Sequence, residues 1–494
     1  MSTLSRKAPP WLVALLLIGF GVGQIAISVY KYQHLLADTM DLGYVRQSLW
    51  MISHGDWIAR SSVFQTPTLA VDGSAWLYPL AYGYRYLGRT DFLFVVQALC
   101  TALAGWGIYR IARLKLAPWV AVAVVAAFAF YPALLGGSQF DWHPDFLALP
   151  ALIWSIYAYR RGRYGWYYAG LIAAVLAKDV ALIAIAGWGL GLFAERRWRD
   201  GAAAVCLAGI GLCVEYLWLF PLLGAANEST ILQSYAYLGS GPFGVVFGAF
   251  DHMGRMARQL ARVGPRYVLW ILGPSLGLTL FGSASLGGAA ALMALNAASK
   301  FGYQQQITDQ YQVLIAGLLA VALAESLGKW APPWQRRLAT AVVSATLIFE
   351  GFFVVQVLYP ILAFAPPHAI RTTQTLRRMI HAFPAHVVVF TQNTAGVWDS
   401  RDPYLGVDDP TTQASYPAPL PVLWREAPPG TPTILLILPH HRLNRYMQVI
   451  IHRAQAAGYR AIPEPGGIKV WKGTAHFPVP GDWAHYFTFA PSPW

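Results

Sequence analysis

The fold of this chain is decided by a pattern that is clearest in residues 119–159, WVAVAVVAAFAFYPALLGGSQFDWHPDFLALPALIWSIYAY. Two apolar stretches, Trp119–Leu135 and Phe146–Tyr159, flank a short run that carries two aspartates and a histidine. A membrane-spanning helix needs about 20 mostly apolar residues, and shorter helices are tolerated inside a bundle. The pattern therefore predicts two helices that cross a membrane and are joined by a polar turn.

The composition of the whole chain indicates the same class. Of its 494 residues, 56% are hydrophobic and 12% are charged, whereas soluble domains carry about 25% charged residues. The formal net charge is +13, and much of the excess lies in short loops between apolar stretches. We therefore interpret the charge as a sign of membrane topology, and we expect a polytopic membrane protein with no nucleic-acid partner.

Hydropathy and loop charge predict about eleven spans. We place them at Trp11–Tyr30, Phe92–Tyr109, Trp119–Leu135, Phe146–Tyr159, Tyr164–Ala177, Val180–Ala194, Ala202–Leu223, Tyr267–Phe281, Ser283–Ser299, Tyr311–Leu327 and Leu338–Ala363. The first is longer than a signal-peptide core and lacks a clear cleavage site, so we expect an uncleaved signal anchor. The chain is expected to break near Gly282, because a single tilted helix there would reverse the side of the basic loop that follows.

Basic residues gather in the loops on one side of these spans. They are Arg6, Lys7, Arg110, Arg113, Lys115, Arg160, Arg161, Arg163, Arg196, Arg197, Arg199, Lys329, Arg336 and Arg337. By the positive-inside rule these loops and the amino terminus are cytoplasmic. The acidic motifs around Asp41, Asp141 and Asp179 then face outward.

Three longer segments are expected on the outer side. Residues 31–91 include Trp76–Leu87, whose aromatic composition is typical of a juxtamembrane helix, and residues 224–266 carry arginines at near-helical spacing. We divide the chain into a membrane domain, 1–365, and a soluble α/β domain, 366–494. In the latter, strands are predicted at His386–Thr391, Thr433–Leu438 and Ile468–Trp471, and a helix at Arg442–Ala457.

Asp41 follows the first span by about ten residues, ahead of Arg46. A carboxylate in the first outer loop, near the membrane surface, could act as general base on an acceptor hydroxyl. The alternative is a solvated loop aspartate or a helix N-cap.

The run Phe140–Asp145 places Asp141, His143 and Asp145 within five residues. Such a set can coordinate a divalent cation, or bind a pyrophosphate through one. The alternative gives Asp145 a role at a helix N-terminus, where negative charge is stabilising.

Lys178 and Asp179 lie between two apolar runs, so they are at the membrane surface or line a polar cavity. The lysine suits a phosphate contact, and the alternative is an ion pair satisfied within itself. Gln310 and Tyr311 could line a sugar-binding cleft or belong to a polar loop. The isolated acids Glu215 and Glu350 are assigned a structural, hydrogen-bonded role, although acids inside spans are functional candidates by default.

The order of these motifs resembles the bacterial and archaeal membrane family catalogued as domain of unknown function 2079, which is similar to the GT-C glycosyltransferases. The resemblance rests on Asp41-Leu42-Gly43 with Gln47-Ser48-Leu49-Trp50, Val96-Gln97-Ala98-Leu99, Tyr131-Pro132, Phe140-Asp141-Trp142-His143-Pro144-Asp145, Ala177-Lys178-Asp179 and Gln310-Tyr311-Gln312. The family usually has a glutamate at the position of Asp145 and an acid pair at Asp179-Val180.

The resemblance implies an all-α polytopic bundle of GT-C type in the bacterial inner membrane, with a small extracytoplasmic α/β domain. It implies transfer of a sugar, with inversion, from a polyprenyl-phosphate donor to an extracytoplasmic lipid, glycan or protein, with Asp41 as the base. Lys178 and the basic outer loop would stabilise the leaving phosphate, while Asp141, His143 and Asp145 would orient the donor or a divalent cation.

Two other classes of function remain open from the sequence. In a transporter or lipid flippase the same charged residues would line a translocation path, but the hydropathy shows no internal repeat, a common transporter feature. In a non-catalytic membrane assembly protein the α/β domain would be the interaction surface.

Overall fold

The structure is a computed structural model, and it describes residues 10–61, 66–87, 89–224, 234–363, 369–382, 388–391, 405–407, 433–437, 445–463 and 468–474. The chain folds as two compact units. The first comprises Met1–Val29, Leu69–Leu77 and Arg89–Ala363, and the second comprises Tyr30–Thr68, Tyr78–Gly88 and Phe364–Trp494. The predicted division at residues 365 and 366 stays a prediction, because the second unit also contains Tyr30–Thr68 and Tyr78–Gly88, which were assigned to the membrane domain.

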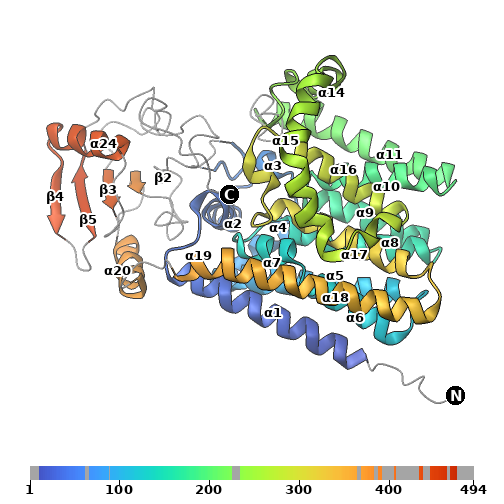
Figure 1. Cartoon of the computed structure of the whole chain (residues 1–494). Helices are drawn as coiled ribbons and strands as arrows, with labels where there is room; N and C mark the ends of the chain where they lie inside the picture. The colour runs from blue at the N-terminus through green and yellow to red at the C-terminus, as the bar shows by residue number, and fades with distance from the viewer. Residues whose placement is uncertain are drawn as a thin grey trace. The chain divides into compact units, whose positions relative to one another are not determined.

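The first unit is a helical bundle (Figure 1). Its main helices are α1 (Pro10–Gln33), α5 (Asp91–Ala112), α6 (Pro118–Ala129), α7 (Pro132–Gln139), α8 (Asp145–Arg160), α9 (Tyr164–Ala177), α10 (Ala181–Ala194), α11 (Trp198–Cys213), α12 (Phe220–Leu222), α14 (Gly241–Asp251), α15 (Met253–Leu272), α16 (Ala284–Ala298), α17 (Val313–Leu327), α18 (Pro332–Phe353) and α19 (Tyr359–Ala363). A π-helix, η2 (Val214–Leu219), joins α11 to α12, and 3-10 turns η3 (Gly273–Ser275) and η4 (Leu278–Phe281) precede α16.

Each of the eleven predicted spans contains helix in the structure, although their lengths differ. Within the described residues, five helical segments have the length and apolarity to cross a membrane: Pro10–Gln33, Asp91–Ala112, Trp198–Leu222, Gln310–Leu327 and Pro332–Leu358. The predicted span Trp119–Leu135 is the pair α6 and α7, bent by 44°. Three more, α9, α10 and α16, are shorter apolar helices, and α8 is a 16-residue helix interrupted by Pro150.

The predicted span Tyr267–Phe281 is not a single helix, although the break expected near Gly282 is present between η4 and α16. Helix α15 begins at Met253, so the arginine-rich part of the outer loop is helical, and it ends at Leu272. The chain then passes through left-handed residues at Leu276 and Gly277 before η4. Hydropathy misses this helix start because exposed arginines are compatible with a helix that leaves the membrane.

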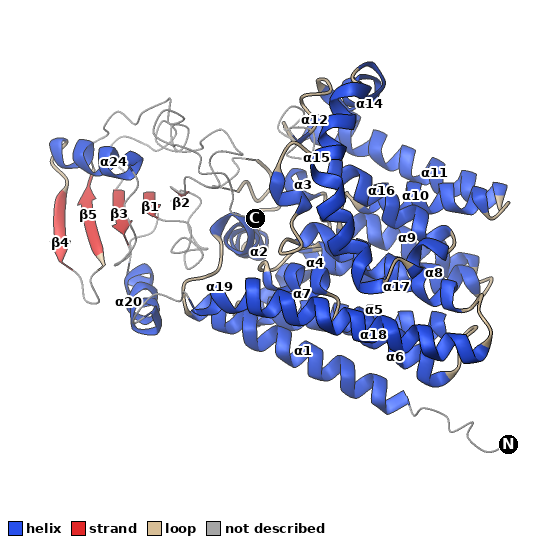
Figure 2. Cartoon of the chain, viewed as in Figure 1, coloured by secondary structure: helices blue, strands red, loops and turns tan. Residues whose placement is uncertain are grey.

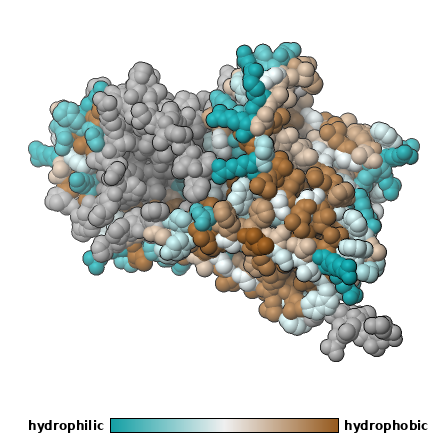
Figure 3. Space-filling view, in the orientation of Figure 1, coloured by the Kyte–Doolittle hydropathy of each residue, from teal (hydrophilic) through white to brown (hydrophobic). Residues whose placement is uncertain are grey.

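Helix α17 forms the centre of the bundle, because every one of its residues is buried. The surrounding helices expose apolar side chains on their outer faces. Examples on α1 are Leu15, Ile18 and Val22, and on α18 they are Ile348 and Phe352. Figure 3 shows this hydrophobic surface in brown over the bundle. Exposed apolar surface of this extent is expected where a helix faces lipid.

Helices α10 and α16 pack closely and antiparallel through small residues. A Cβ placed on Gly191 would lie 2.5 Å from the backbone of Ala284, and one on Gly187 would lie 2.4 Å from the carbonyl oxygen of Gly287. Small residues let helix backbones approach this closely in membranes. The register brings the start of α10 level with the end of α16, near Ala298 and Lys300.

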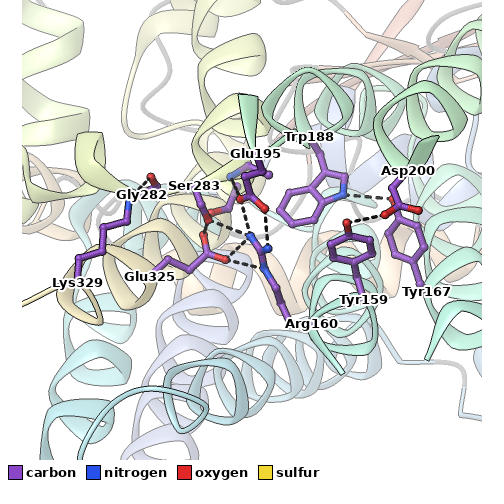
Figure 4. A network of polar contacts seen from close by, with 12 residues as sticks. Tyr159, Arg160, Tyr167, Trp188, Glu195, Asp200, Gly282, Ser283, Glu325 and Lys329 are labelled. Carbon is purple, nitrogen blue, oxygen red and sulfur yellow. Dashed lines mark hydrogen bonds and ion pairs between the residues drawn. The ribbon is translucent and has the colours of Figure 1, made fainter. Parts of the chain in front are cut away.

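A charged network ties four helices together at the end of the bundle where Arg160 lies (Figure 4). The Arg160 guanidinium donates two hydrogen bonds of 2.8 and 2.9 Å to the carboxylate of Glu195 and one of 2.9 Å to Glu325. The Glu195 carboxylate also accepts a bond from the Ala284 amide at 2.8 Å, and Ser283 bonds to Glu325. Thus α8, α10 and α17 end where α16 begins, which defines what we call the Arg160 end.

The second unit contains α2 (Tyr44–Ser53), most of α4 (Leu77–Leu87), α20 (Ala369–Ala382), α24 (Arg445–Ala456) and a five-stranded sheet (Figure 2). Strands β1 (Val388–Thr391), β3 (Thr433–Ile437) and β5 (Lys469–Gly473) and helix α24 correspond to predicted elements, whereas β2 (Leu405–Val407) and β4 (Arg460–Pro463) were not predicted. The sheet order is β2-β1-β3-β5-β4. Strand β1 pairs in parallel with β2 and with β3, whereas β5 pairs antiparallel with β3 and with β4. Helix α4 confirms the helix expected at Trp76–Leu87.

Candidate functional site

The Phe140–Asp145 motif joins α7 to α8 at the end of the bundle opposite Arg160. Asp141 has a left-handed backbone, with φ 65°, which is uncommon for a residue other than glycine. Asp141, His143 and Asp145 are all buried, and the ring of Phe140 stacks on that of His143 at 5.7 Å. Asp145 is the first residue of α8, so its carboxylate lies where the helix dipole favours negative charge.

The chain segment that carries Gln310 and Tyr311 lies against the same end of α7. A Cβ on Gly136 would lie 1.9 Å from the carbonyl oxygen of Ile307, and one on Gly137 would lie 3.4 Å from the Cα of Gln310. Two glycines in α7 therefore permit a backbone contact that larger residues would prevent. The tertiary structure thus brings Gln310 beside the segment that leads into Asp141 and His143.

Lys178 and Asp179 form a buried pair between α9 and α10. Their Nζ and Oδ1 atoms are 3.9 Å apart, with side chains 14% and 4% exposed, so the contact is an ion pair that is too long for a hydrogen bond. Asp179 Oδ1 accepts a 2.7 Å bond from the Val180 amide. A Cβ on Gly73 would lie 2.9 Å from the Asp179 Cβ, so the segment before Trp76 covers this pair.

All of these residues lie at one end of the bundle. Helices α8, α10 and α17 end at the Arg160 network, so their first residues are at the opposite end, which we call the Lys178 end. Asp145, Asp179 and Gln310 each precede or open one of these helices. The predicted grouping of the membrane-domain residues on one side therefore follows from the observed helix directions.

Glu215 was assigned a structural role from the sequence, but its surroundings in the fold are those of a functional residue. It lies in the π-helix η2, a geometry often found at functional sites, and it is 6% exposed. Within the described part of the chain no group donates a hydrogen bond to its Oε2. Its carboxyl group interacts electrostatically with Asp179 and Lys178. The sequence signal was an isolated acid in a span, but its neighbours are decided by helix packing.

Asp309 is a second buried acid, omitted from the predicted site, and it lies beside α7. Its side chain accepts a 2.8 Å hydrogen bond from the Thr308 hydroxyl, and a Cβ on Gly137 would lie 3.2 Å from its carbonyl oxygen. Its position directly before Gln310 was the available signal.

Asp41 and Arg46 belong to the second unit. Asp41 lies in a π-helix, η1 (Thr39–Gly43), that leads directly into α2, and it is half-buried. Arg46 is buried in α2 with its guanidinium 5.7 Å from the centre of the Tyr32 ring. An aspartate in a π-helical turn differs from the solvated loop residue that was the alternative interpretation.

The expected divalent-cation site gains no support. Among the described residues, which include Asp141, His143 and Asp145, no three His, Cys, Asp or Glu side chains come together as a metal-binding group.

Comparison with solved structures shows the GT-C fold. The crystal structure of ArnT from Cupriavidus metallidurans bound to undecaprenyl phosphate superposes with a TM-score of 0.54 at 14% identity, covering 94% of this chain and 98% of that one. The archaeal oligosaccharyltransferase AglB from Archaeoglobus fulgidus, in complex with an inhibitory peptide and a dolichol-phosphate, gives a TM-score of 0.43 at 12% identity, covering 94% of this chain and 75% of that one.

No curated protein matches the sequence. A family model described as predicted membrane protein, DUF2079, matches residues 31–394. This range includes Asp41, the Phe140–Asp145 motif, the Lys178–Asp179 pair and the Gln310–Gln312 segment. The chain therefore belongs to the DUF2079 family of predicted membrane proteins.

Proposed function

We propose that this protein is a membrane glycosyltransferase that takes a sugar from a polyprenyl-phosphate carrier and transfers it to an acceptor on the outer side of the membrane. The observation that carries the proposal is the likeness to ArnT over nearly the whole of both chains. That structure holds undecaprenyl phosphate, a lipid carrier of the proposed class. A shared fold does not by itself establish a reaction. The residues of the site must therefore be able to bind the donor and to activate the acceptor.

The buried polar residues at the Lys178 end support a phosphate-binding and sugar-binding role. Burying a charged side chain within the membrane costs free energy, so such residues usually mark a substrate path or a functional site. Lys178 is held by Asp179, which is itself fixed by the Val180 amide. In the proposed reaction Lys178 binds the donor phosphate. Arg46, which belongs to the second unit, contacts the substrate. The residues that orient the donor are Asp141, His143, Asp145, Gln310 and Tyr311.

In the reaction itself, the Asp41 carboxylate removes the proton from an acceptor hydroxyl as that oxygen attacks the anomeric carbon. The bond between this carbon and the phosphate oxygen breaks, the new glycosidic bond forms with inversion, and the polyprenyl phosphate leaves with the bonding electrons. Lys178 stabilises the negative charge that develops on the phosphate.

The test is a transfer assay with the purified full-length protein and a polyprenyl-phosphate donor carrying a radiolabelled sugar. Loss of a general base typically lowers turnover by about 10²- to 10⁴-fold, so Asp41→Asn should show that loss while donor binding persists. The matched control is Asp56→Asn, a carboxylate of the same unit whose Oδ1 accepts hydrogen bonds from the Ile58 and Ala59 amides. Wild-type transfer rates in Asp41→Asn would rule out the assigned base.

A transporter or flippase would behave differently in the same material. Reconstituted protein would move the labelled lipid between leaflets and form no glycosidic product. Product formation by the wild-type protein, absent in Asp41→Asn, separates the enzyme from that class and from a non-catalytic assembly protein.

A further inference from the structure

A basic pocket lies at the Lys178 end of the bundle. Its arginines belong to the outer loop that the resemblance assigned, together with Lys178, to the leaving phosphate, but the reaction proposed above uses Lys178 alone for that phosphate. It has a volume of about 220 Å³ and is lined by Tyr237, Arg255, Arg258, Gln259, Arg262 and Lys300. Among these lining residues, all of them in the described part of the chain, four are cations and none is a carboxylate. The pocket is smaller than the 300–1,000 Å³ typical of drug-sized ligands, so its size suits a single small anionic group.

The floor of this pocket is fixed by the end of α16. The last carbonyl groups of a helix lack partners within the helix, and here side chains supply them. Tyr237 donates to the Ala298 carbonyl at 2.7 Å, Gln259 donates to that of Ser299 at 2.7 Å, and Gln305 donates to Ser299 at 2.8 Å. Tyr237 and Gln259 are therefore held in place before any ligand binds.

The three arginines are exposed on one face of α15, at spacings of three and four residues, which places them side by side. Within the described residues none of them, nor Lys300, forms an ion pair with a carboxylate. Figure 3 shows hydrophilic side chains gathered over the region of α14 and α15. Guanidinium groups present paired donors that match the geometry of phosphate oxygens.

The surroundings of the pocket are typical of the depth at which a membrane meets water. Helix α14, which runs into α15, exposes Phe247 and Phe250, and α15 begins with the exposed Met253. Apolar side chains next to arginines are typical of a helix at the headgroup level. The register of α10 and α16 places this pocket at the same end of the bundle as Lys178.

The charge of the pocket suits a highly charged anion. A sugar linked through a phosphodiester carries one negative charge, whereas a phosphomonoester carries nearly two at neutral pH. Four cations with no carboxylate among the lining residues match the more highly charged group. We propose that the basic pocket binds a phosphomonoester or diphosphate group of the acceptor, so that the substrate of this enzyme is a phosphate-bearing glycan or lipid. The identification of the bound group as part of the acceptor rests on the proposed function. The existence of an anion site in this pocket does not.

The test uses the full-length protein in lipid nanodiscs and two probes. Inorganic pyrophosphate in solution represents a soluble acceptor, and phosphatidic acid in a phosphatidylcholine nanodisc represents a lipid acceptor. The variant Arg255→Gln/Arg258→Gln/Arg262→Gln should weaken binding of the preferred probe by about 10- to 100-fold, the range for losing one or two hydrogen bonds to a charged group. Whichever probe the wild type prefers identifies the source of the phosphate.

The matched control removes the same charge from the other end of the bundle, in Arg161→Gln/Arg163→Gln/Arg336→Gln, three residues that are also exposed. It should bind both probes as the wild type does. Equal losses in the two variants, or binding of neither probe by the wild type, would overturn the proposal.

Donor binding separates this site from the one at Lys178. The pocket variant should bind a polyprenyl-phosphate sugar with wild-type affinity. A loss of donor affinity as large as that in Lys178→Ala would show that the pocket and Lys178 bind the same anion, which would refute a separate anion site. A wild-type protein that binds the phosphate probe but transfers no sugar would refute the proposed function and leave the anion site standing.

Discussion

Lys178 and Asp179 show how a single pair of residues acquires a role from its surroundings. The ion pair expected as one alternative is present, with 3.9 Å between the Lys178 Nζ and the Asp179 Oδ1. Glu215 acts on the same pair from another helix. The aliphatic part of the Lys178 side chain is already ordered by its surroundings. Binding of a phosphate by this lysine should therefore cost little conformational entropy.

Replacing the lysine tests this role. Lys178→Ala should weaken donor binding by about 10- to 100-fold, because a hydrogen bond to a charged group is lost, and transfer should fall with it. Lys115→Ala is the matched control. It removes an exposed lysine that lies beside Gly328 at the Arg160 end of the bundle, so donor affinity should stay close to the wild type. Equilibrium binding of a labelled donor to both variants measures the difference; a normal affinity in Lys178→Ala would remove the lysine from the site.

Among the elements, α7 is the one whose packing positions most of the site. Its glycines bring the Ile307–Gln310 segment against the chain that enters Phe140–Asp145. The bend of 44° between α6 and α7 follows from Pro132, which cannot donate the backbone hydrogen bond that a straight helix would require.

Gly136→Ala should disturb this contact. The added methyl group would meet a backbone carbonyl oxygen at 1.9 Å, and overpacking of this kind costs about 1–3 kcal/mol. We expect a lower thermal midpoint of the purified protein and reduced transfer. Gly19→Ala on α1, where no atom lies within 4 Å of the added Cβ, should leave both unchanged. Equal stability of the two variants would show that the segment can move aside.

The Arg160 end gives a pH dependence. Burial by itself raises the pKa of the Glu195 carboxyl, but hydrogen bonds from Arg160 and the Ala284 amide outweigh it and lower the pKa from 4.5 to about 2. A group with a lowered pKa in the folded state stabilises the fold above its unfolded value. That contribution is therefore full above pH 4.5 and is lost as the pH falls toward about 2.

Melting curves between neutral and acidic pH measure this effect. Glu195→Gln should be less stable than the wild type at neutral pH and should lose less stability on acidification. Asp251→Asn, which changes an exposed carboxyl group, should follow the wild-type profile. A Glu195→Gln protein with the wild-type slope would place the pH dependence in other groups.

For the whole molecule, the arrangement of charge predicts an orientation in the membrane. The Arg160 end is surrounded by the basic loops, so the positive-inside rule places it in the cytoplasm and the Lys178 end outside. Alkaline phosphatase fused after Ala363 should be active, and the same enzyme fused after Arg197 should be inactive. The reverse result would place the acidic motifs in the cytoplasm and remove the case for an outward-facing donor site.

The sequence by itself determined the class, the helices and the strands with long apolar runs. These depend on local properties, since a run of apolar residues fixes a span and flanking charged residues mark its ends. The ends of α9 and α10 and the position of α24 could be predicted in this way. The membrane-domain motifs could also be assigned to one side, because helices that alternate in direction leave little choice.

Only the tertiary structure decided which distant residues meet. Nothing local links Gly136 to Ile307 or Arg160 to Glu325, since each contact depends on how whole helices pack. The same packing brings Glu215 into the electrostatic range of Lys178. The helical start of α15 and the π-helix around Glu215 are also tertiary results, because exposed arginines and an apolar span are compatible with several backbone geometries. For the same reason the sequence showed the arginines of α15 as a basic loop, and only folding joined them to Lys300 in a pocket.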